Sequence, residues 1–239
     1  MIVVTSTARK AATALDCAES VRTQTEPHAH WFACADGFTL ERATGQGTHA
    51  FPAPRKALTN LIDMWLACDD ADIIVHLDGD DWLPDDQTLA RVAGTYAAAD
   101  APWLAYGSFE RSDGIRDHVW DGAFGLRYAP GAGPRAQRWR ASHLKTFRAG
   151  LVKRLIAEHS NYLRDHTGAW FDTCLDRAVM LPLLELAGER YAVAPDVRCV
   201  YHYAANAQHQ TNAHEHREAV DRQRIHCMPA LPALTERPW

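Results

Sequence analysis

The order of apolar and polar residues along the first 110 positions predicts strands separated by helices. Short runs of consecutive apolar residues are typical of strands that are buried on both faces of a sheet. Such runs occur at 2–5, 31–36, 73–78 and 103–109. The segments between them carry apolar residues at helical spacing, which predicts helices over about 11–23, 58–66 and 86–99. This alternation predicts an α/β fold with a mostly parallel sheet flanked by helices.

The second half of the chain has a less regular pattern. Residues 110–142 are rich in turn-forming residues and predict a long loop. Helices are expected near 148–158 and over 173–187, the second ending at Gly188 because glycine is favoured just after a helix. A late strand is expected at 197–203, and the tail that follows begins polar and becomes helical.

Composition and charge narrow the class of protein. The 239 residues are 47% hydrophobic, which is enough for a sizeable core, and the formal net charge of -5 argues against a broad nucleic-acid surface. No stretch reaches the roughly 20 apolar residues that a membrane helix needs, so no membrane span is expected. The cysteines are scattered without a C-x-x-C pair and the chain starts unlike a signal peptide, which favours the cytoplasm.

The stretch "IIVHLDGDDWLPDD", residues 73–86, places an apolar strand directly before a cluster of carboxylates. In open α/β sheets, ligands bind beyond the carboxyl ends of the strands, where Asp78, Asp80 and Asp81 would lie. Carboxylate oxygens are ligands that Mg²⁺ and Mn²⁺ prefer. Gly79 would allow the backbone to come close to a ligand. Because like charges repel, we also expect a positive group among these aspartates.

The aspartate cluster alone leaves several interpretations open. A surface turn rich in aspartate is common, and an unrelated magnesium enzyme such as a nucleotidyltransferase could carry the same D-x-D pattern. A calcium loop starting at Asp78 is excluded, because it would need glycine at 83 and glutamate at 89, and both are leucine.

A series of motifs in order along the chain gives the cluster a wider context. They read "VVTST", "ESVRTQT", "WFACADG", "LTNLIDMWLACDDADIIVHLDGDDWLPDD", "SHLKTFRAGLVKRL" and "DRAVMLPLLELAGERYAVAPDVRCVYHY". This order resembles the GT-A glycosyltransferases, in particular the inverting group called family two. The resemblance implies a GT-A domain over 1–205, with a nucleotide-sugar and metal half at 1–110 and an acceptor half at 111–205. Residues 206–239 would form a C-terminal helical extension.

The resemblance also implies an activity. It would be a metal-dependent, inverting transfer of a sugar from a nucleoside-diphosphate sugar, most often a UDP-sugar, to a hydroxyl group. Thr5 and Ser6 would line the nucleotide, Asp36 would accept a hydrogen bond from the base, Asn60 stands at the asparagine position of the family, and Asp78 would lie near the ribose and the metal.

Further roles follow from the same resemblance. Asp80 would be the main ligand of Mn²⁺ or Mg²⁺, with Asp78 beside it, and His202 could complete the metal shell. The catalytic base would be Asp176, with Asp172 as the alternative, although either could simply be a carboxylate favoured at a helix start. His143 is expected to pack locally.

Other assignments are weaker. Arg9, Lys56 and Arg135 could contact the diphosphate, but each is also typical of an ordinary surface charge. A zinc site made by three histidines of the tail is less favoured because they lack a metalloprotease spacing and a nearby cysteine; these are His209, His214 and His216.

Two other functions compete with this prediction. A sugar- or nucleotide-binding protein could keep the fold without catalysis, and a glycosyltransferase could act on a modified base in DNA. The negative net charge disfavours DNA without excluding it. The sequence identifies neither the sugar nor the acceptor.

Overall fold

A seven-stranded sheet forms the centre of the protein. The computed structural model describes all residues except 9–10, 35–48, 52–55, 99, 114–125 and 203–211. The strand order is β3-β2-β1-β4-β6-β5-β7. The strands are β1 Ile2–Ala8, β2 His28–Cys34, β3 His49–Phe51, β4 Ile73–His76, β5 Leu104–Arg111, β6 Lys145–Arg148 and β7 Tyr191–Tyr201. Strand β6 runs antiparallel to β4 and β5, and the other pairs are parallel, so the predicted mixed, mostly parallel sheet is confirmed.

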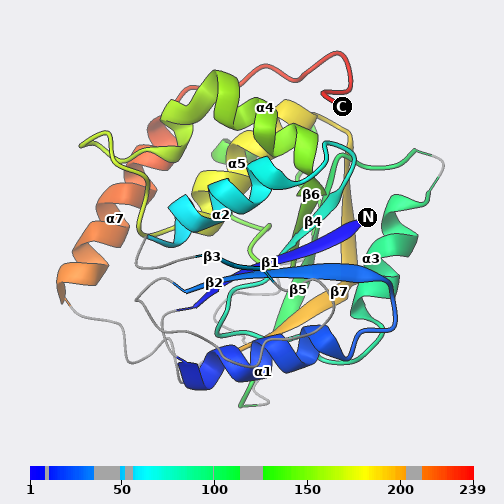
Figure 1. Ribbon diagram of the computed structural model, residues 1–239. Coiled ribbons are helices and arrows are strands. Elements are labelled where there is room, and N and C mark those ends of the chain that lie inside the picture. Colours follow the sequence, from blue (N-terminus) through cyan, green and yellow to red (C-terminus); the bar gives the residue numbers. More distant parts are fainter. Residues whose placement is uncertain (9–10, 35–48, 52–55, 99, 114–125, 203–211) are drawn as a thin grey trace.

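Helices cover both faces of this sheet. They are α1 Ala11–Arg22, α2 Ala57–Ala67, α3 Thr88–Tyr96, α4 Ala149–His159, α5 Leu175–Ala187 and α7 Asn212–Cys227, with short 3-10 turns η2 Pro134–Ala136 and η3 Ser160–Leu163. Helices α2, α4 and α5 lie on one face and α1 and α3 on the other, while α7 lies along the outer side of α5 (Figure 1). Among the described helices, none has both the length and the hydropathy required to cross a bilayer.

Each face of the sheet has its own hydrophobic core, which explains why the strands are apolar throughout. In β1, Val3 packs on the side of α2, α4 and α5, whereas Val4 packs on the side of α1 and α3. The apolar stripe expected on α2 is confirmed, and its Trp65 is completely buried. The exception is Leu66, which is exposed at the end of the helix.

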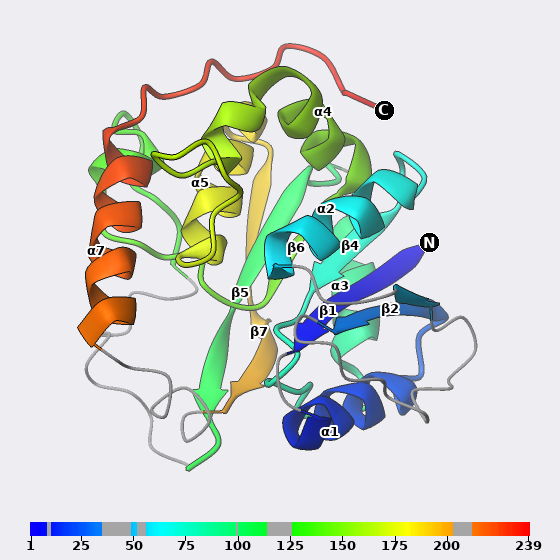
Figure 2. The same cartoon turned by 60° about the vertical axis from the view of Figure 1, so that its left-hand side comes forward.

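The chain after α7 packs against the main core. Residues 228–239 run back over the face that carries α4 and α5 (Figure 2). The Leu234 N–H donates to the Leu186 carbonyl at 2.9 Å, and the Trp239 ring lies edge-on to Trp103 with centroids 5.5 Å apart. Helix α5 ends at Gly188 as predicted, with φ 60, and the Gly188 N–H donates to the carbonyls of Leu184 and Glu185 in the last turn. This tail therefore shares its core with the sheet domain.

Two strands were not predicted from the sequence. Strand β3 has three residues and β6 has four. In β6 the sequence is "KTFR", and a charged residue at each end hides the apolar pattern of a buried strand. Its position matters because β6 lies between β4 and β5 and aligns Lys145 with His76.

Candidate functional site

The aspartate cluster lies at the carboxyl end of β4, where three basic side chains surround Asp78. The Lys145 Nζ donates to Asp78 Oδ2 at 2.9 Å, and the His143 Nε2 lies 3.4 Å from the same oxygen. The His76 Nε2 lies 3.1 Å from Asp78 Oδ1. The positive group expected among the aspartates is therefore present, but it comes from a strand 67 residues away.

The strand register explains how these side chains meet. His76 and Lys145 are paired across β4 and β6. Because side chains alternate along a strand, Asp78 shares a face with His76, and His143 shares a face with Lys145. Continuing the antiparallel register by two residues places His143 opposite Asp78, in agreement with their contact.

The electrostatics of this group favour an ionised Asp78. Burial alone would raise the pKa of Asp78, but the Lys145 ammonium and the hydrogen bonds from His143 and His76 outweigh it and hold that pKa well below its usual value. Burial opposes the charge of Lys145 as well, yet Asp78 and then Asp176 raise its pKa. Burial, assisted by Lys145, lowers the pKa of His76, which keeps that ring neutral.

Among the described residues, neither Asp80 nor Asp81 is paired with a lysine or an arginine, although the His143 ring lies 3.5 Å from Asp81. Burial, followed by the charge of Asp78, raises the pKa of Asp80, and among the described residues no ion pair to Asp80 is present. Asp81 is almost completely buried, and burial and the charges of Asp78 and Asp80 raise its pKa well above the usual value. Its Oδ1 accepts a hydrogen bond from the His202 backbone N–H at 2.9 Å.

Gly79 is required by a close approach between two backbones. A Cβ atom at this position would lie 2.4 Å from the Thr7 carbonyl oxygen, and the Gly79 N–H donates to that same oxygen at 2.9 Å. The glycine therefore holds the aspartate loop against the end of β1. The close approach seen here is to the protein's own backbone, whereas the predicted one was to a ligand.

The donor set fits a divalent ion. If Asp78 and Asp80 are ionised, the Lys145 ammonium offsets one of their two negative charges, and a bound divalent ion would offset the other. Asp80 supplies carboxylate oxygens of the kind that Mn²⁺ and Mg²⁺ prefer. A second set, Asp81, His143 and Cys199, has its possible ligand atoms within 4.8 Å of one another. In that set the Cys199 Sγ lies 3.9 Å from Asp81 Oδ2, and His143 Nε2 lies 3.5 Å from the same oxygen.

The carboxylate of Asp176 lies in the first turn of α5. Its Oδ2 accepts hydrogen bonds from Trp139 Nε1 at 3.0 Å and from Ser142 Oγ at 3.4 Å. Cys174, at the start of the helix, has a left-handed backbone with φ 54, which a non-glycine residue adopts at a cost of roughly 1 kcal/mol. Strained residues of this kind occur often at functional sites.

Asp172 has a different environment from Asp176. Its Oδ2 lies 3.5 Å from the Lys56 Nζ and accepts from Arg217 at 3.2 Å. Asp172 is therefore held by two cations, whereas Trp139 and Ser142, the donors to Asp176, are neutral. The charge of Asp176 also contributes to the raised pKa of Lys145.

The segment before and within β6 joins the two groups of carboxylates. Ser142 contacts Asp176, while His143 and Lys145 contact Asp78. His143 packs as expected, with its ring edge-on to Phe109 and Tyr201, but it also contacts Asp78 in the cluster. No apolar alternation marks this segment in the sequence, because Ser142 and Thr146 are polar and only Leu144 separates His143 from Lys145.

Some residues predicted to bind the nucleotide lie in the interior. Thr5 and Ser6 are fully buried. The Thr5 hydroxyl accepts a hydrogen bond from Trp65 Nε1 at 3.2 Å, and the Ser6 hydroxyl lies 3.1 Å from His30 Nε2. In these positions neither hydroxyl lines a surface. Asn60 is also buried, on α2.

The remaining predicted residues fall in several places. Asp36, Arg9 and His209 lie outside the described residues. His202 lies beside the cluster, where its ring packs edge-on against Trp82 with centroids 5.5 Å apart. His214 and His216 both lie on α7, two positions apart, so they do not share a helix face.

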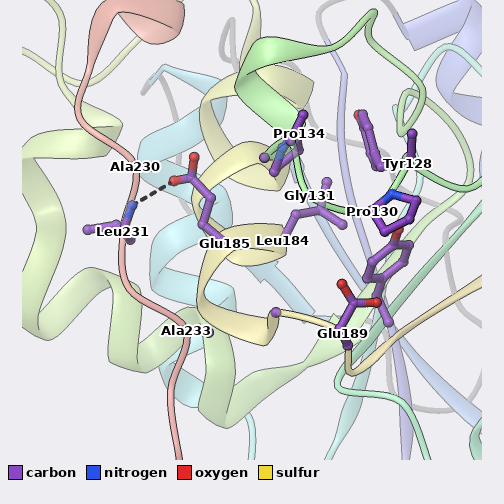
Figure 3. Close-up of a pocket in the computed structure, with 15 residues that line it drawn as sticks. Tyr128, Pro130, Gly131, Pro134, Leu184, Glu185, Glu189, Ala230, Leu231 and Ala233 are labelled. Carbon is purple, nitrogen blue, oxygen red and sulfur yellow. Dashed lines mark hydrogen bonds between the residues drawn. The ribbon is translucent and has the colours of Figure 1, made fainter.

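Arg135 and Glu185 form a buried ion pair at a distance from the cluster. The Arg135 Nε donates to Glu185 Oε1 at 2.6 Å, so Arg135 is not an ordinary surface charge. The Leu231 N–H also donates to Glu185 (Figure 3). Glu185 borders a cavity of about 260 Å³ between residues 128–134, the end of α5 and residues 230–233. None of the predicted site residues that the structure describes lines this cavity.

Comparison with solved structures identifies the architecture. S. aureus TarS matches with a TM-score of 0.60 over 94% of this chain and 43% of TarS, at 11% identity. The mannosyltransferase PcManGT from Pyrobaculum calidifontis, solved with GDP-Man and Mn²⁺, matches with a TM-score of 0.54 over 84% of this chain and 56% of that protein, at 15% identity. The chain has the GT-A fold.

The GT-A fold confirms the resemblance that the motifs indicated, and at these identities it is the fold alone that is shared. A complex of TarS 1–349 with UDP-GlcNAc matches with a TM-score of 0.50 over 82% of this chain and 56% of that one, at 11% identity. No protein-family profile and no curated protein sequence matches the chain. The chain spans about half the length of TarS and of the mannosyltransferase.

Proposed function

We propose that this GT-A protein is a metal-dependent, inverting glycosyltransferase that moves a sugar from a UDP-sugar to a hydroxyl acceptor. The observation that carries the proposal is the arrangement of carboxylates along the segment that enters β6. Lys145 contacts Asp78 directly, and Ser142, three residues earlier, contacts Asp176. A donor-binding cluster and a candidate base therefore border one central strand. The solved proteins of the same fold were crystallised with GDP-Man and Mn²⁺ or with UDP-GlcNAc, which supports a nucleotide-sugar donor.

In the proposed donor site, Asp80, Asp78 and Asp36 have different roles. Asp80 holds the divalent ion, because it has no ion pair among the described residues, and His202 lies close enough to the cluster to assist. Asp78 is oriented by Lys145 and faces the ribose, and Asp36 would accept the hydrogen bond of the base. A bound divalent ion supplies positive charge that stabilises the departing diphosphate.

Asp176 is the proposed base. It would take the proton from the acceptor hydroxyl while that oxygen attacks the anomeric carbon from the face opposite the diphosphate, which inverts the configuration. The hydrogen bonds from Trp139 and Ser142 fix one oxygen of this carboxylate. Asp172 remains the alternative base, but its ion pairs with Lys56 and Arg217 favour a structural role.

The proposal is tested by donor binding. Isothermal titration with UDP, GDP and their sugar conjugates, with and without Mn²⁺, should give binding that needs Mn²⁺ and favours the uridine nucleotide. Asp80→Ala should abolish the Mn²⁺-dependent binding without unfolding the protein. Asp86→Ala is the matched control, because this exposed aspartate belongs to the same stretch but lies outside the cluster.

Several outcomes would change the conclusion. Unchanged nucleotide affinity of Asp80→Ala at saturating Mn²⁺ would remove the metal assignment. Donor binding with no turnover on a broad acceptor panel would favour the non-catalytic binding protein. Retention on DNA at low salt would favour a DNA-modifying enzyme.

A further inference from the structure

Lys145 occupies a position that is costly for a lysine. Only 1% of its side chain is exposed, and it lies on β6 in the middle of the sheet. An ammonium group loses its hydration in such a place, and the loss must be offset by a charged partner. The Lys145 Nζ donates a hydrogen bond to Asp78 at 2.9 Å. The lysine and the first aspartate of the D-x-D pattern therefore form one unit.

This unit divides the aspartate cluster into two parts. The two oxygens of Asp78 already contact His76 on one side and Lys145 on the other. Asp80 has no ion pair among the residues that the structure describes. An incoming divalent ion therefore meets one carboxylate without a cation and one whose charge is offset by Lys145. At a separation of a few ångströms in a partly buried site, a lysine charge also repels a metal ion appreciably.

We propose that Lys145 is a positioning residue that reserves Asp78 for the nucleotide and makes tight metal binding conditional on the nucleotide diphosphate. The proposal rests on the proposed function. Asp81 is almost completely buried and its Oδ1 already accepts the His202 N–H. Without nucleotide, Asp80 therefore offers too few anionic oxygens to hold the ion against the charge of Lys145. The diphosphate supplies the missing oxygens, so metal and nucleotide bind together, and Asp78 stays oriented by its lysine throughout.

The experiment measures Mn²⁺ binding without nucleotide, using the electron paramagnetic resonance signal of free Mn²⁺. Lys145→Met removes the charge, and we expect this variant to bind Mn²⁺ alone at least about tenfold more tightly than wild type, or about 1.4 kcal/mol. Its affinity for UDP at saturating Mn²⁺ should fall, because Asp78 loses its orientation. Lys145→Arg, which keeps a cation, should retain wild-type Mn²⁺ binding.

A matched control distinguishes the loss of a positive charge beside Asp78 from the loss of a positive charge elsewhere on the protein. Lys153→Met removes a lysine of α4 that pairs with Asp70 at 2.6 Å, and its Mn²⁺ affinity should equal that of wild type. A merely structural Lys145 would predict weaker Mn²⁺ binding in Lys145→Met, which is the opposite sign. Equal or weaker binding by a folded Lys145→Met, including no detectable binding by either protein, overturns the proposal.

A second measurement keeps the test decisive if Lys145→Met does not fold. Wild type should bind Mn²⁺ at least about tenfold more tightly with saturating UDP than without it. Equal affinity under the two conditions overturns the proposal. If no nucleotide binds at all, the proposed function fails, while the comparison of nucleotide-free Mn²⁺ affinities still reports on Lys145.

Discussion

The buried pair Arg135–Glu185 gives a prediction that concerns stability alone. Only 8% and 3% of the two side chains are exposed. Two hydrogen bonds of 2.6 and 3.1 Å join the guanidinium to the carboxylate. Arg135 also donates to the Ile225 carbonyl of α7, and Glu185 accepts from the Leu231 N–H at 3.2 Å. The pair thus holds together η2, α5, α7 and the chain that follows.

Arg135→Met should be strongly destabilising because it leaves the Glu185 carboxylate buried without its cation. Removing one partner of a buried ion pair costs about 3–5 kcal/mol. For a chain of this size, the loss corresponds to a fall in melting temperature on the order of 10 °C. The assay is urea unfolding followed by circular dichroism, with the free energy of unfolding compared between variant and wild type.

The Arg127–Glu189 pair provides the control. Its atoms are 3.0 Å apart, but the side chains are 48% and 83% exposed. Arg127→Met should cost at most about 1 kcal/mol, as is usual for surface ion pairs. Equal losses for Arg127→Met and Arg135→Met would refute the reasoning. The double variant Arg135→Met/Glu185→Leu should recover much of the loss, because no buried charge is then left alone.

Two further predictions concern the candidate base and the response to acid. Asp176→Asn should leave donor and metal binding nearly intact and lower turnover by at least about a hundredfold in a steady-state assay, whereas Asp172→Asn should be milder; the reverse order would exchange their roles. Burial lowers the pKa of His30 in the folded protein to about 3. As the pH falls below about 6.5, His30 is protonated in the unfolded chain but not in the folded protein, so the free energy of unfolding decreases until the pH reaches about 3. At pH 5 this loss amounts to roughly 2 kcal/mol. Urea unfolding measures the free energy of unfolding at pH 7 and at pH 5, and the difference between the two values should be smaller for His30→Gln than for wild type. An unchanged difference would assign the effect to other groups.

The contrast between predicted and observed elements has a physical basis. Strands β1, β2, β4, β5 and β7 were found because their apolar runs lie on a sheet covered on both faces. Strand β6 was not predicted because it is short and because Lys145 is not apolar. The burial of this lysine is made possible by its ion pair with Asp78. The order of apolar and polar residues near Lys145 cannot reveal this ion pair. The pair forms only because β6 lies antiparallel between β4 and β5.

The limits of the predicted site follow from strand length and strand register. Thr5 and Ser6 were assigned to a strand end, but β1 continues to Ala8, so both lie in mid-strand and their hydroxyls face opposite cores. The aspartate cluster could be recognised because its members are adjacent in sequence. Its basic partners His143 and Lys145 could not, because they meet it only through the alignment of β4 with β6.

The place of β6 in the sheet has a consequence for the order in which the protein is assembled. Strand β6 lies between β4 and β5 in the sheet, although it follows both of them in the chain. Strands β4 and β5 each form hydrogen bonds with β6 and not with each other. A ribosome delivers Asp78 well before Lys145, 67 residues later. Until then the growing chain carries its acidic loop without the ammonium that neutralises it. Since non-local pairing is slow to form, closure of the sheet and completion of the charged site become the same late event in biosynthesis.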